Sequence, residues 1–242
     1  MIFQILQNNS FSYPERLILL AFMLAVVFGS LTLHEVAHGY ASYALGDFTA
    51  KERGRLSLNP LKHLHPVGML CMIFCGFGWA KAVPVDPSQY KNPKKGMAIT
   101  ALAGPLTNLV IGVAFTVYLS VFVWLVESGV YALMPIIKYM TQGVYDIIWM
   151  VLYVILYYNL LLAVFNLFPV PPLDGSRLLL AFLPEDKYFK IMRYETLIML
   201  LMFFLLWTGF FTGFFETFVH LIITGVGNAV CLALNLLASI VF

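Results

Sequence analysis

The chain has 242 residues, of which 61% are hydrophobic and only 11% are charged, and its formal net charge is +2. Soluble proteins carry about 25% charged residues, so the composition excludes an ordinary soluble domain and indicates a protein embedded in a lipid bilayer. The small net charge argues against a nucleic-acid partner. The polar segments are too short for a second folded unit, so we expect a single membrane-embedded domain over residues 1–242.

Five apolar runs are long enough to cross a bilayer as helices, which takes about 20 residues. They cover residues 17–45, 97–126, 145–168, 196–212 and 214–240. A sixth run, 66–80, is shorter, follows directly on His65-Pro66 and contains three glycines, so we expect it to re-enter the membrane without crossing. The predicted fold is an all-α polytopic membrane protein with about five spanning helices and one re-entrant segment.

The basic residues support this arrangement. Segments 46–63, 81–96 and 169–195 hold four Lys or Arg residues each, and only Arg16 and Lys138 lie elsewhere. A re-entrant 66–80 places all three segments on one side, with 12 basic residues against two, whereas a spanning 66–80 gives nine against five. Because Lys and Arg favour cytoplasmic loops, we predict that the three segments are cytoplasmic and that the N-terminus is outside.

A metal-binding motif lies inside the first apolar run. Residues 34–38 read His34-Glu35-Val36-Ala37-His38, the H-E-x-x-H signature of zinc hydrolases. Roughly 0.003 such matches are expected by chance in a chain of this composition. The i, i+4 spacing puts both imidazoles on one helix face, where they can bind one zinc ion, and Glu35 projects to the side. Polar groups at this membrane depth are usually functional, so the motif predicts a hydrolase that cuts other membrane-embedded chains.

A catalytic zinc needs a third protein ligand and an open position for water. Asp174 is our candidate, because it follows the run 145–168 after three prolines that should break the helix, and Gly175 then permits a tight turn. The break would let Asp174 point back into the helical bundle, where its charge would partly balance that of the metal. The remaining histidines, of which we prefer His65, are weaker candidates, and the alternative for Asp174 is a helix cap in a loop.

At these residues the sequence resembles the site-2 protease family of intramembrane zinc metalloproteases. The matching segments are 34–38, 78–85, 103–108 and 166–175, which together extend over roughly residues 30–180. The segment 78–85 is similar to that of the compact prokaryotic branch without PDZ or CBS domain, although this branch commonly has proline where this chain has Ala82.

The resemblance implies that His34, His38 and Asp174 bind one Zn²⁺ per chain and that Glu35 is the catalytic base. It implies a catalytic core over about 17–180, followed by C-terminal helices at about 196–240. It also matches Asn108 to a family asparagine that contacts the substrate or the oxyanion.

The residues alone leave a second reading of Asn108 open. It follows a Gly-Pro pair inside an apolar run, and its side chain could satisfy the backbone carbonyl that Pro105 leaves without a hydrogen bond.

The leading interpretation is a membrane-embedded zinc endopeptidase that cleaves within or near transmembrane segments of membrane-protein substrates. We expect its active site to open toward the cytoplasm of a prokaryotic plasma membrane. Residues 79–85 read as a short extended element near the active site. They could pair with an unwound substrate as an edge strand, or form a covered hairpin without substrate contact.

Two other function classes remain as alternatives. A metal-ion transporter could use His34, His38 and Asp174 as a transit site, although it would not need Glu35 and should show repeat symmetry. A catalytically inactive relative could bind and hold membrane proteins, against which the complete His-Glu-His-Asp set argues. The sequence leaves the substrate, the cleavage site and the oligomeric state open.

Overall fold

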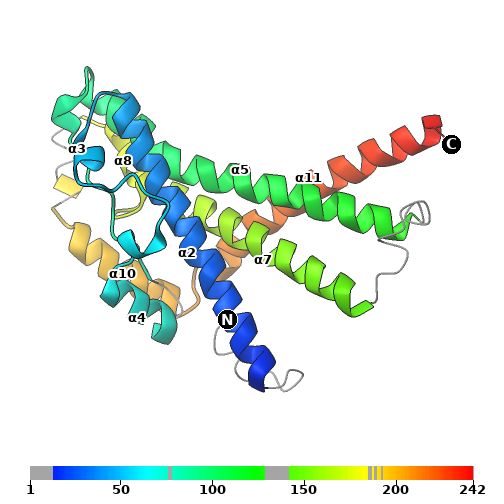
Figure 1. The fold of residues 1–242 in the computed structure, drawn as a ribbon. Coiled ribbons are helices and arrows are strands. Elements are labelled where there is room, and N and C mark those ends of the chain that lie inside the picture. The colour runs from blue at the N-terminus through cyan, green and yellow to red at the C-terminus, as the bar shows by residue number, and fades with distance from the viewer. Residues whose placement is uncertain are drawn as a thin grey trace.

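The computed structural model describes residues 13–75, 78–128, 142–184, 187, 190–191 and 193–241. Within these ranges the chain is helical, and no strand forms (Figure 1). The α-helices are α2 (Tyr13–Ala44), α3 (Thr49–Glu52), α4 (Pro66–Cys75), α5 (Pro93–Glu127), α7 (Gln142–Leu167), α8 (Asp174–Phe182), α10 (Glu195–Trp207) and α11 (Thr212–Val241). Two 3-10 turns, η1 (Pro60–Lys62) and η2 (Pro87–Gln89), lie in the loops before α4 and before α5.

Four of these helices, α2, α5, α7 and α11, are long and apolar enough to cross a membrane. They occupy four of the five predicted runs and confirm an all-helical, polytopic architecture. The fifth run holds only the 13-residue α10, which at 1.5 Å per residue is about 20 Å long, less than the roughly 30 Å of bilayer hydrocarbon. The expected number of five spans is therefore not confirmed.

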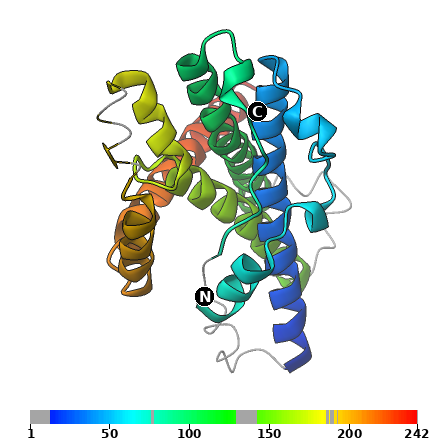
Figure 2. The ribbon, with the colours of Figure 1, turned by 90° about the vertical axis from the view of Figure 1, so that its left-hand side faces the viewer.

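Helix α5 lies at the centre of the molecule and packs against α2, α7, α8 and α11 (Figures 1 and 2). The apolar core sits between α5, α7 and α11, around Leu119, Leu156, Leu160 and Val219. Trp124 on α5 donates a 2.7 Å hydrogen bond from its Nε1 to Asn235 on α11. α5 thus holds the other long helices in place around it.

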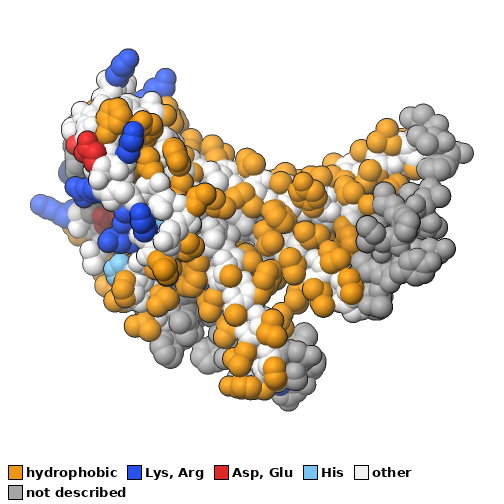
Figure 3. All heavy atoms as spheres, in the orientation of Figure 1, with side chains coloured by type: hydrophobic (Ala, Val, Ile, Leu, Met, Phe, Trp, Pro, Cys, Tyr) orange, Lys and Arg blue, Asp and Glu red, His pale blue; other side chains and the backbone are white. Residues whose placement is uncertain are grey.

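The molecule has one polar end. The C-terminal end of α2, the N-terminal end of α5, and helices α3 and α8 lie together at the left of Figure 1. The charged side chains visible in Figure 3 gather at this end, while hydrophobic side chains cover most of the remaining surface in that view. The C-terminal ends of α5 and α11 and the N-terminal end of α7 lie at the opposite end (Figure 1).

A buried carboxylate organises the polar end. Asp47 follows α2 and accepts hydrogen bonds from Ser42 Oγ at 2.7 Å and from the Asp86 backbone N–H at 2.7 Å. Ser42 Oγ also forms a 2.6 Å hydrogen bond with the Tyr90 hydroxyl. That hydroxyl in turn lies 3.2 Å from Thr100 Oγ1 on α5. Burial acts to raise the pKa of Asp47, but these hydrogen bonds lower it below its ordinary value. Asp47 therefore ties the end of α2 to the loop before α5.

The stretches of chain before and after α4 lie side by side. α4 has ten residues and is about 15 Å long. Its flanks are joined, because Leu64 and Ala80 form an isolated antiparallel bridge and the Lys81 N–H donates to the His63 carbonyl at 2.7 Å. A Cβ on Gly68 would meet the Trp79 backbone, so this glycine permits the close approach of α4 to the stretch of chain that follows it. A single bridge does not make residues 79–85 a β-strand, so that expectation is not confirmed.

Candidate active site

The two histidines of the motif are buried on one face of α2. Their rings are 4.6 Å apart between centroids and nearly perpendicular, and their Nε2 atoms are 3.0 Å apart. The i, i+4 spacing on a continuous helix produces this arrangement, as the sequence predicts. Both imidazoles thus present one nitrogen to the same point in space.

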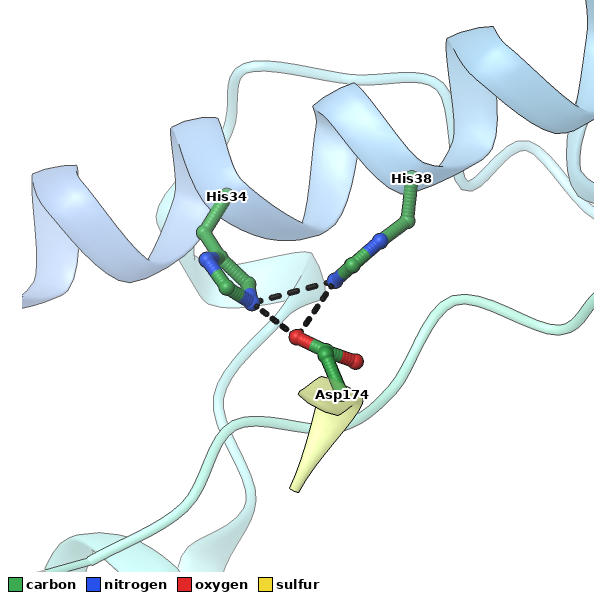
Figure 4. Close-up of side chains that lie close together, drawn as sticks. All are labelled: His34, His38 and Asp174. Carbon is green, nitrogen blue, oxygen red and sulfur yellow. Dashed lines mark hydrogen bonds and ion pairs between the residues drawn. The ribbon is translucent and has the colours of Figure 1, made fainter. Parts of the chain in front are cut away.

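Asp174 reaches that point from a segment about 140 residues further along the chain. α7 ends at Leu167, and α8 begins at Asp174 after a connection that contains three prolines. Asp174 Oδ2 lies 3.0 Å from His34 Nε2 and 3.1 Å from His38 Nε2 (Figure 4). The predicted break in the helix is present, and it aims the carboxylate into the bundle.

Gly175 contributes by its small size and not by an unusual backbone angle. The residue is buried within α8 and is not among the glycines with positive φ. A Cβ here would meet the Leu167 carbonyl and lie 2.6 Å from the Phe168 carbonyl oxygen. Glycine therefore allows α8 to begin directly against the end of α7, which differs from the tight turn that we expected.

The three ligand atoms fit a zinc ion. His38 Nδ1 lies 2.6 Å from the Thr100 backbone carbonyl, which can only accept, so Nδ1 carries the proton and Nε2 presents a lone pair. His34 Nδ1 lies 2.6 Å from an amide oxygen, Oδ1 of Asn108, with the same consequence. Two such lone pairs at 3.0 Å would repel each other unless a cation lay between them.

The distances agree with this interpretation. Zinc bonds of 2.0–2.1 Å at tetrahedral angles separate neighbouring ligand atoms by about 3.3 Å. The separations among His34, His38 and Asp174 are 3.0–3.1 Å. Among the described residues, these three side chains form the one group whose arrangement suits a metal ion.

Asp174 supplies negative charge to the centre. Its Oδ2 is directed at the Nε2 atoms of His34 and His38, and an aspartate carboxylate in that position would partly balance the charge of a bound zinc ion.

Glu35 lies next to the metal centre and outside the three-ligand group. The side chain is half-buried, and its Oε2 accepts a 2.8 Å hydrogen bond from the Val83 backbone N–H. The loop that follows Ala80 thus holds the carboxylate in place. This arrangement suits a group that acts on a bound water and does not bind the metal.

Asn108 is fully buried behind His34. Its Oδ1 faces His34 Nδ1, and its amide nitrogen donates to Asn159 Oδ1 at 2.9 Å and to the Ser30 carbonyl at 3.3 Å. The side chain therefore does not satisfy the carbonyl freed by Pro105, which was the second reading of this residue.

Sequence reasoning missed Asn159 and Ser30, which lie behind Asn108. Asn159 carried a signal, because it is an amide in the middle of the apolar run 145–168. Ser30 carried little, because a small hydroxyl is common in spanning helices.

The other histidines stay outside the centre. His65 Nδ1 accepts from the Gly68 N–H at 3.2 Å and so caps the start of α4. His63 donates from Nε2 to the Ser57 carbonyl at 2.7 Å. His220 is exposed on α11. These placements favour Asp174 over His65, the other candidate third ligand.

A protein-family model establishes which family the chain belongs to. The model of peptidase family M50, the site-2 protease family, matches residues 22–209. The chain belongs to peptidase family M50. This family assignment, together with the four apolar helices, makes it a zinc metalloprotease of membrane-protein character.

The chain is also similar to two named zinc metalloproteases. "Putative zinc metalloprotease YwhC" of Bacillus subtilis is 36% identical over 185 residues, which cover 76% of this chain and 78% of that protein. "Putative zinc metalloprotease Rip2" of Mycolicibacterium smegmatis is 27% identical over 151 residues, which cover 60% of this chain and 51% of that protein. No solved structure matches the chain.

We predict that Gly104→Ala removes zinc from this M50 peptidase. Gly104 on α5 lies directly against the two imidazoles, and a Cβ there would meet His38 Nε2 and lie 2.7 Å from His34 Cε1. Zinc per chain, measured by elemental mass spectrometry on detergent-purified protein, should fall well below the wild-type value. Gly29→Ala on α2 is the matched control, because nothing lies within 4 Å of its added Cβ. Full zinc in Gly104→Ala would contradict the placement of the rings.

Proposed function

We propose that this M50 peptidase hydrolyses peptide bonds within or near the transmembrane segments of other membrane proteins. The observation that carries the proposal is the group formed by His34, His38 and Asp174. Both histidines are buried on α2, which is long and apolar enough to span a membrane, and Asp174 begins α8. A hydrolytic centre enclosed in this way can act only on chains that share the bilayer.

His34, His38 and Asp174 are the residues that would hold the zinc ion. When bound, zinc lowers the pKa of a coordinated water and polarises the scissile carbonyl. Two neutral imidazoles and one carboxylate reduce the charge of the centre from +2 to about +1, which lowers the cost of burying it. A third histidine in place of Asp174 would leave the full metal charge in the bundle.

Glu35 is the general base in this proposal. Its carboxylate accepts the proton of the attacking water and then donates a proton to the leaving amine. The Val83 N–H engages Oε2, which orients the carboxylate and leaves Oε1 for the water. Sequence adjacency to His34 keeps Glu35 beside the metal on the same helix.

We propose that Asn108 acts through His34. Contact with the substrate or the oxyanion would require a free amide N–H, and both N–H groups of Asn108 are committed to Ser30 and Asn159. Its oxygen is committed to His34. The side chain is therefore best suited to orient a zinc ligand.

The active site is proposed to open toward the cytoplasm of a prokaryotic cell. The basic segments share the polar end of the molecule, and Asp174 begins the helix next to that end (Figures 1 and 3). With the paired flanks of α4 on the same side, residues 66–80 re-enter the membrane and the N-terminus lies outside.

We propose that residues 79–85 bind the unwound substrate by main-chain hydrogen bonds, as the edge strand of a sheet binds an extended peptide. The N–H groups of Lys81 and Val83 point toward His63 and Glu35. Because neighbouring residues of extended chain point to opposite sides, the N–H groups of Ala80 and Ala82 face away. Main-chain pairing along that side would hold the unwound substrate on the segment whose Val83 N–H orients Glu35.

Zinc binding and cleavage test the proposed chemistry together. We expect about one zinc per chain in the wild type and in Glu35→Gln, and much less in Asp174→Ala. Glu35→Gln should cleave a transmembrane substrate at least about 100-fold more slowly, because it keeps the metal and loses the base. Cleavage by Glu35→Gln at the wild-type rate would refute the role of Glu35. Wild-type protein that binds and transports zinc without any cleavage would favour the transporter alternative.

Substitution at Ala80 tests the substrate edge. Ala80→Pro removes the N–H that the proposal assigns to the substrate and should slow substrate cleavage at least several-fold, while zinc per chain remains at the wild-type value. Ala80→Ser keeps the N–H and is the matched control. Unchanged cleavage by Ala80→Pro would point to a covered hairpin.

Cysteine labelling tests the membrane orientation. In a cysteine-free background, Lys62→Cys and Lys91→Cys should both resist a membrane-impermeant maleimide in intact cells and react after the cells are opened. Tyr13→Cys, at a position that is 71% exposed, should react in intact cells. Opposite behaviour of positions 62 and 91 would show that residues 66–80 cross the membrane.

A further inference from the structure

We propose that Asn159 is a positioning residue that fixes the tautomer of His34 through Asn108, with Ser30 as its anchor. The inference rests on the proposed zinc-binding role of His34. Asn159 belongs to α7, touches neither His34 nor Asp174 in any hydrogen bond of the structure, and is 1% exposed. Its effect on the metal is therefore indirect and depends on one chain of contacts.

The chain of contacts runs from the metal centre to the backbone of two helices. Asn108 Oδ1 lies 2.6 Å from His34 Nδ1, and Asn108 Nδ2 donates to Asn159 Oδ1 at 2.9 Å. Asn159 Nδ2 donates to Ser30 Oγ at 2.9 Å and to the Ile155 carbonyl at 2.8 Å. Asn108 Nδ2 also donates to the Ser30 carbonyl at 3.3 Å. Every polar atom of both amides has a partner.

The backbone carbonyls of Ser30 and Ile155 determine which atom donates and which accepts in each hydrogen bond of this network. An asparagine amide can rotate by half a turn and exchange its oxygen and nitrogen with almost no change in shape. If Asn159 turned, its oxygen would face the Ile155 carbonyl, and two acceptors would meet in a buried site. If Asn108 turned, its oxygen would face both the Ser30 carbonyl and Asn159 Oδ1. The observed orientation is the one in which every contact joins a donor to an acceptor.

This orientation determines which nitrogen of His34 can bind a metal. Because Asn108 presents an oxygen, His34 Nδ1 must carry the proton, and Nε2 keeps a lone pair toward His38 and Asp174. A turned Asn108 would present N–H groups, draw the lone pair to Nδ1 and place the proton on Nε2, where the zinc should bind. Asn159 opposes that turn by accepting from Asn108.

The second histidine shows why the extra layer is needed. His38 Nδ1 donates to the Thr100 carbonyl, an acceptor that belongs to the backbone and cannot rotate. His34 relies on a side-chain amide for the same purpose. Of the two histidines, only His34 therefore needs a further residue to hold its partner Asn108 in place, and Asn159 is that residue.

Zinc affinity tests the inference directly. The dissociation constant of zinc would be measured in detergent by competition with a chelator of known affinity, for wild type and Asn159→Leu. We expect Asn159→Leu to bind zinc about 10-fold more weakly, the lower end of the effect of losing a ligand's direct partner, because Asn159 acts one residue further from the metal. Asn159→Asp should stay close to wild type, because a buried, neutral carboxyl can still accept from Asn108 and donate to Ile155.

A matched control separates positioning from packing. Thr116 is 1% exposed on α5, and its hydroxyl bonds only the Gly112 carbonyl of its own helix. Thr116→Val should leave zinc affinity unchanged. Thermal unfolding in excess chelator reports the stability of each variant without zinc, and the visible absorption of bound cobalt reports the geometry of the ligands. A purely structural role for Asn159 predicts lower stability in Asn159→Leu with wild-type metal affinity and an unaltered cobalt spectrum.

The outcomes also distinguish this inference from the proposed function. Wild-type protein that binds no zinc would defeat the proposed function. Zinc bound equally by wild type and Asn159→Leu would overturn the role of Asn159 and leave the function intact. If Asn159→Leu does not fold, Ser30→Ala removes the oxygen that anchors Asn159 and should weaken zinc binding several-fold, and an unchanged affinity in that variant would overturn the inference.

Discussion

The meeting of His34 and His38 with Asp174 is the contact on which the rest of the structure depends. It joins residues about 140 positions apart in the chain at 3.0–3.1 Å. Three polar groups with convergent lone pairs are costly in an apolar interior unless a cation binds them. The fold near the centre can be understood as what is needed to bring them together and to keep every other polar atom satisfied.

Helix α5 meets most of that need, although it provides no zinc ligand. Gly104 lets its backbone lie against the imidazoles, Thr100 supplies a carbonyl to His38, and Asn108 supplies an amide oxygen to His34. Thr100 is held in turn through Tyr90 by the network around Asp47 at the polar end. The metal centre is thus supported from two sides, by a hydrogen-bonded loop network on one and by the Asn159 amide on the other.

Local patterns predicted the group formed by His34, His38 and Asp174, and left its supports unpredicted. The i, i+4 spacing of His34 and His38 has one geometric consequence on any helix, and the prolines before Asp174 allow few alternatives to a break. The acceptors behind the imidazoles depend on how α2, α5 and α7 cross, and no spacing in one segment encodes that. The run 196–212 shows the same limit, because its apolar composition hides the turn after Trp207, where Gly209 adopts a φ of +76°.

Glu35 and the loop that holds it connect the metal-binding group to the α4 segment. Val83 donates to Glu35, and three residues earlier Ala80 pairs with Leu64, so the same stretch of backbone orients the base and closes the α4 segment. Next to Ala80, the Trp79 ring stacks on Phe203 of α10 at 5.9 Å. Displacing this stretch would release the Glu35 carboxylate and open the Leu64–Ala80 bridge together. The position of Glu35 and the closed flanks of α4 therefore depend on the same segment of backbone.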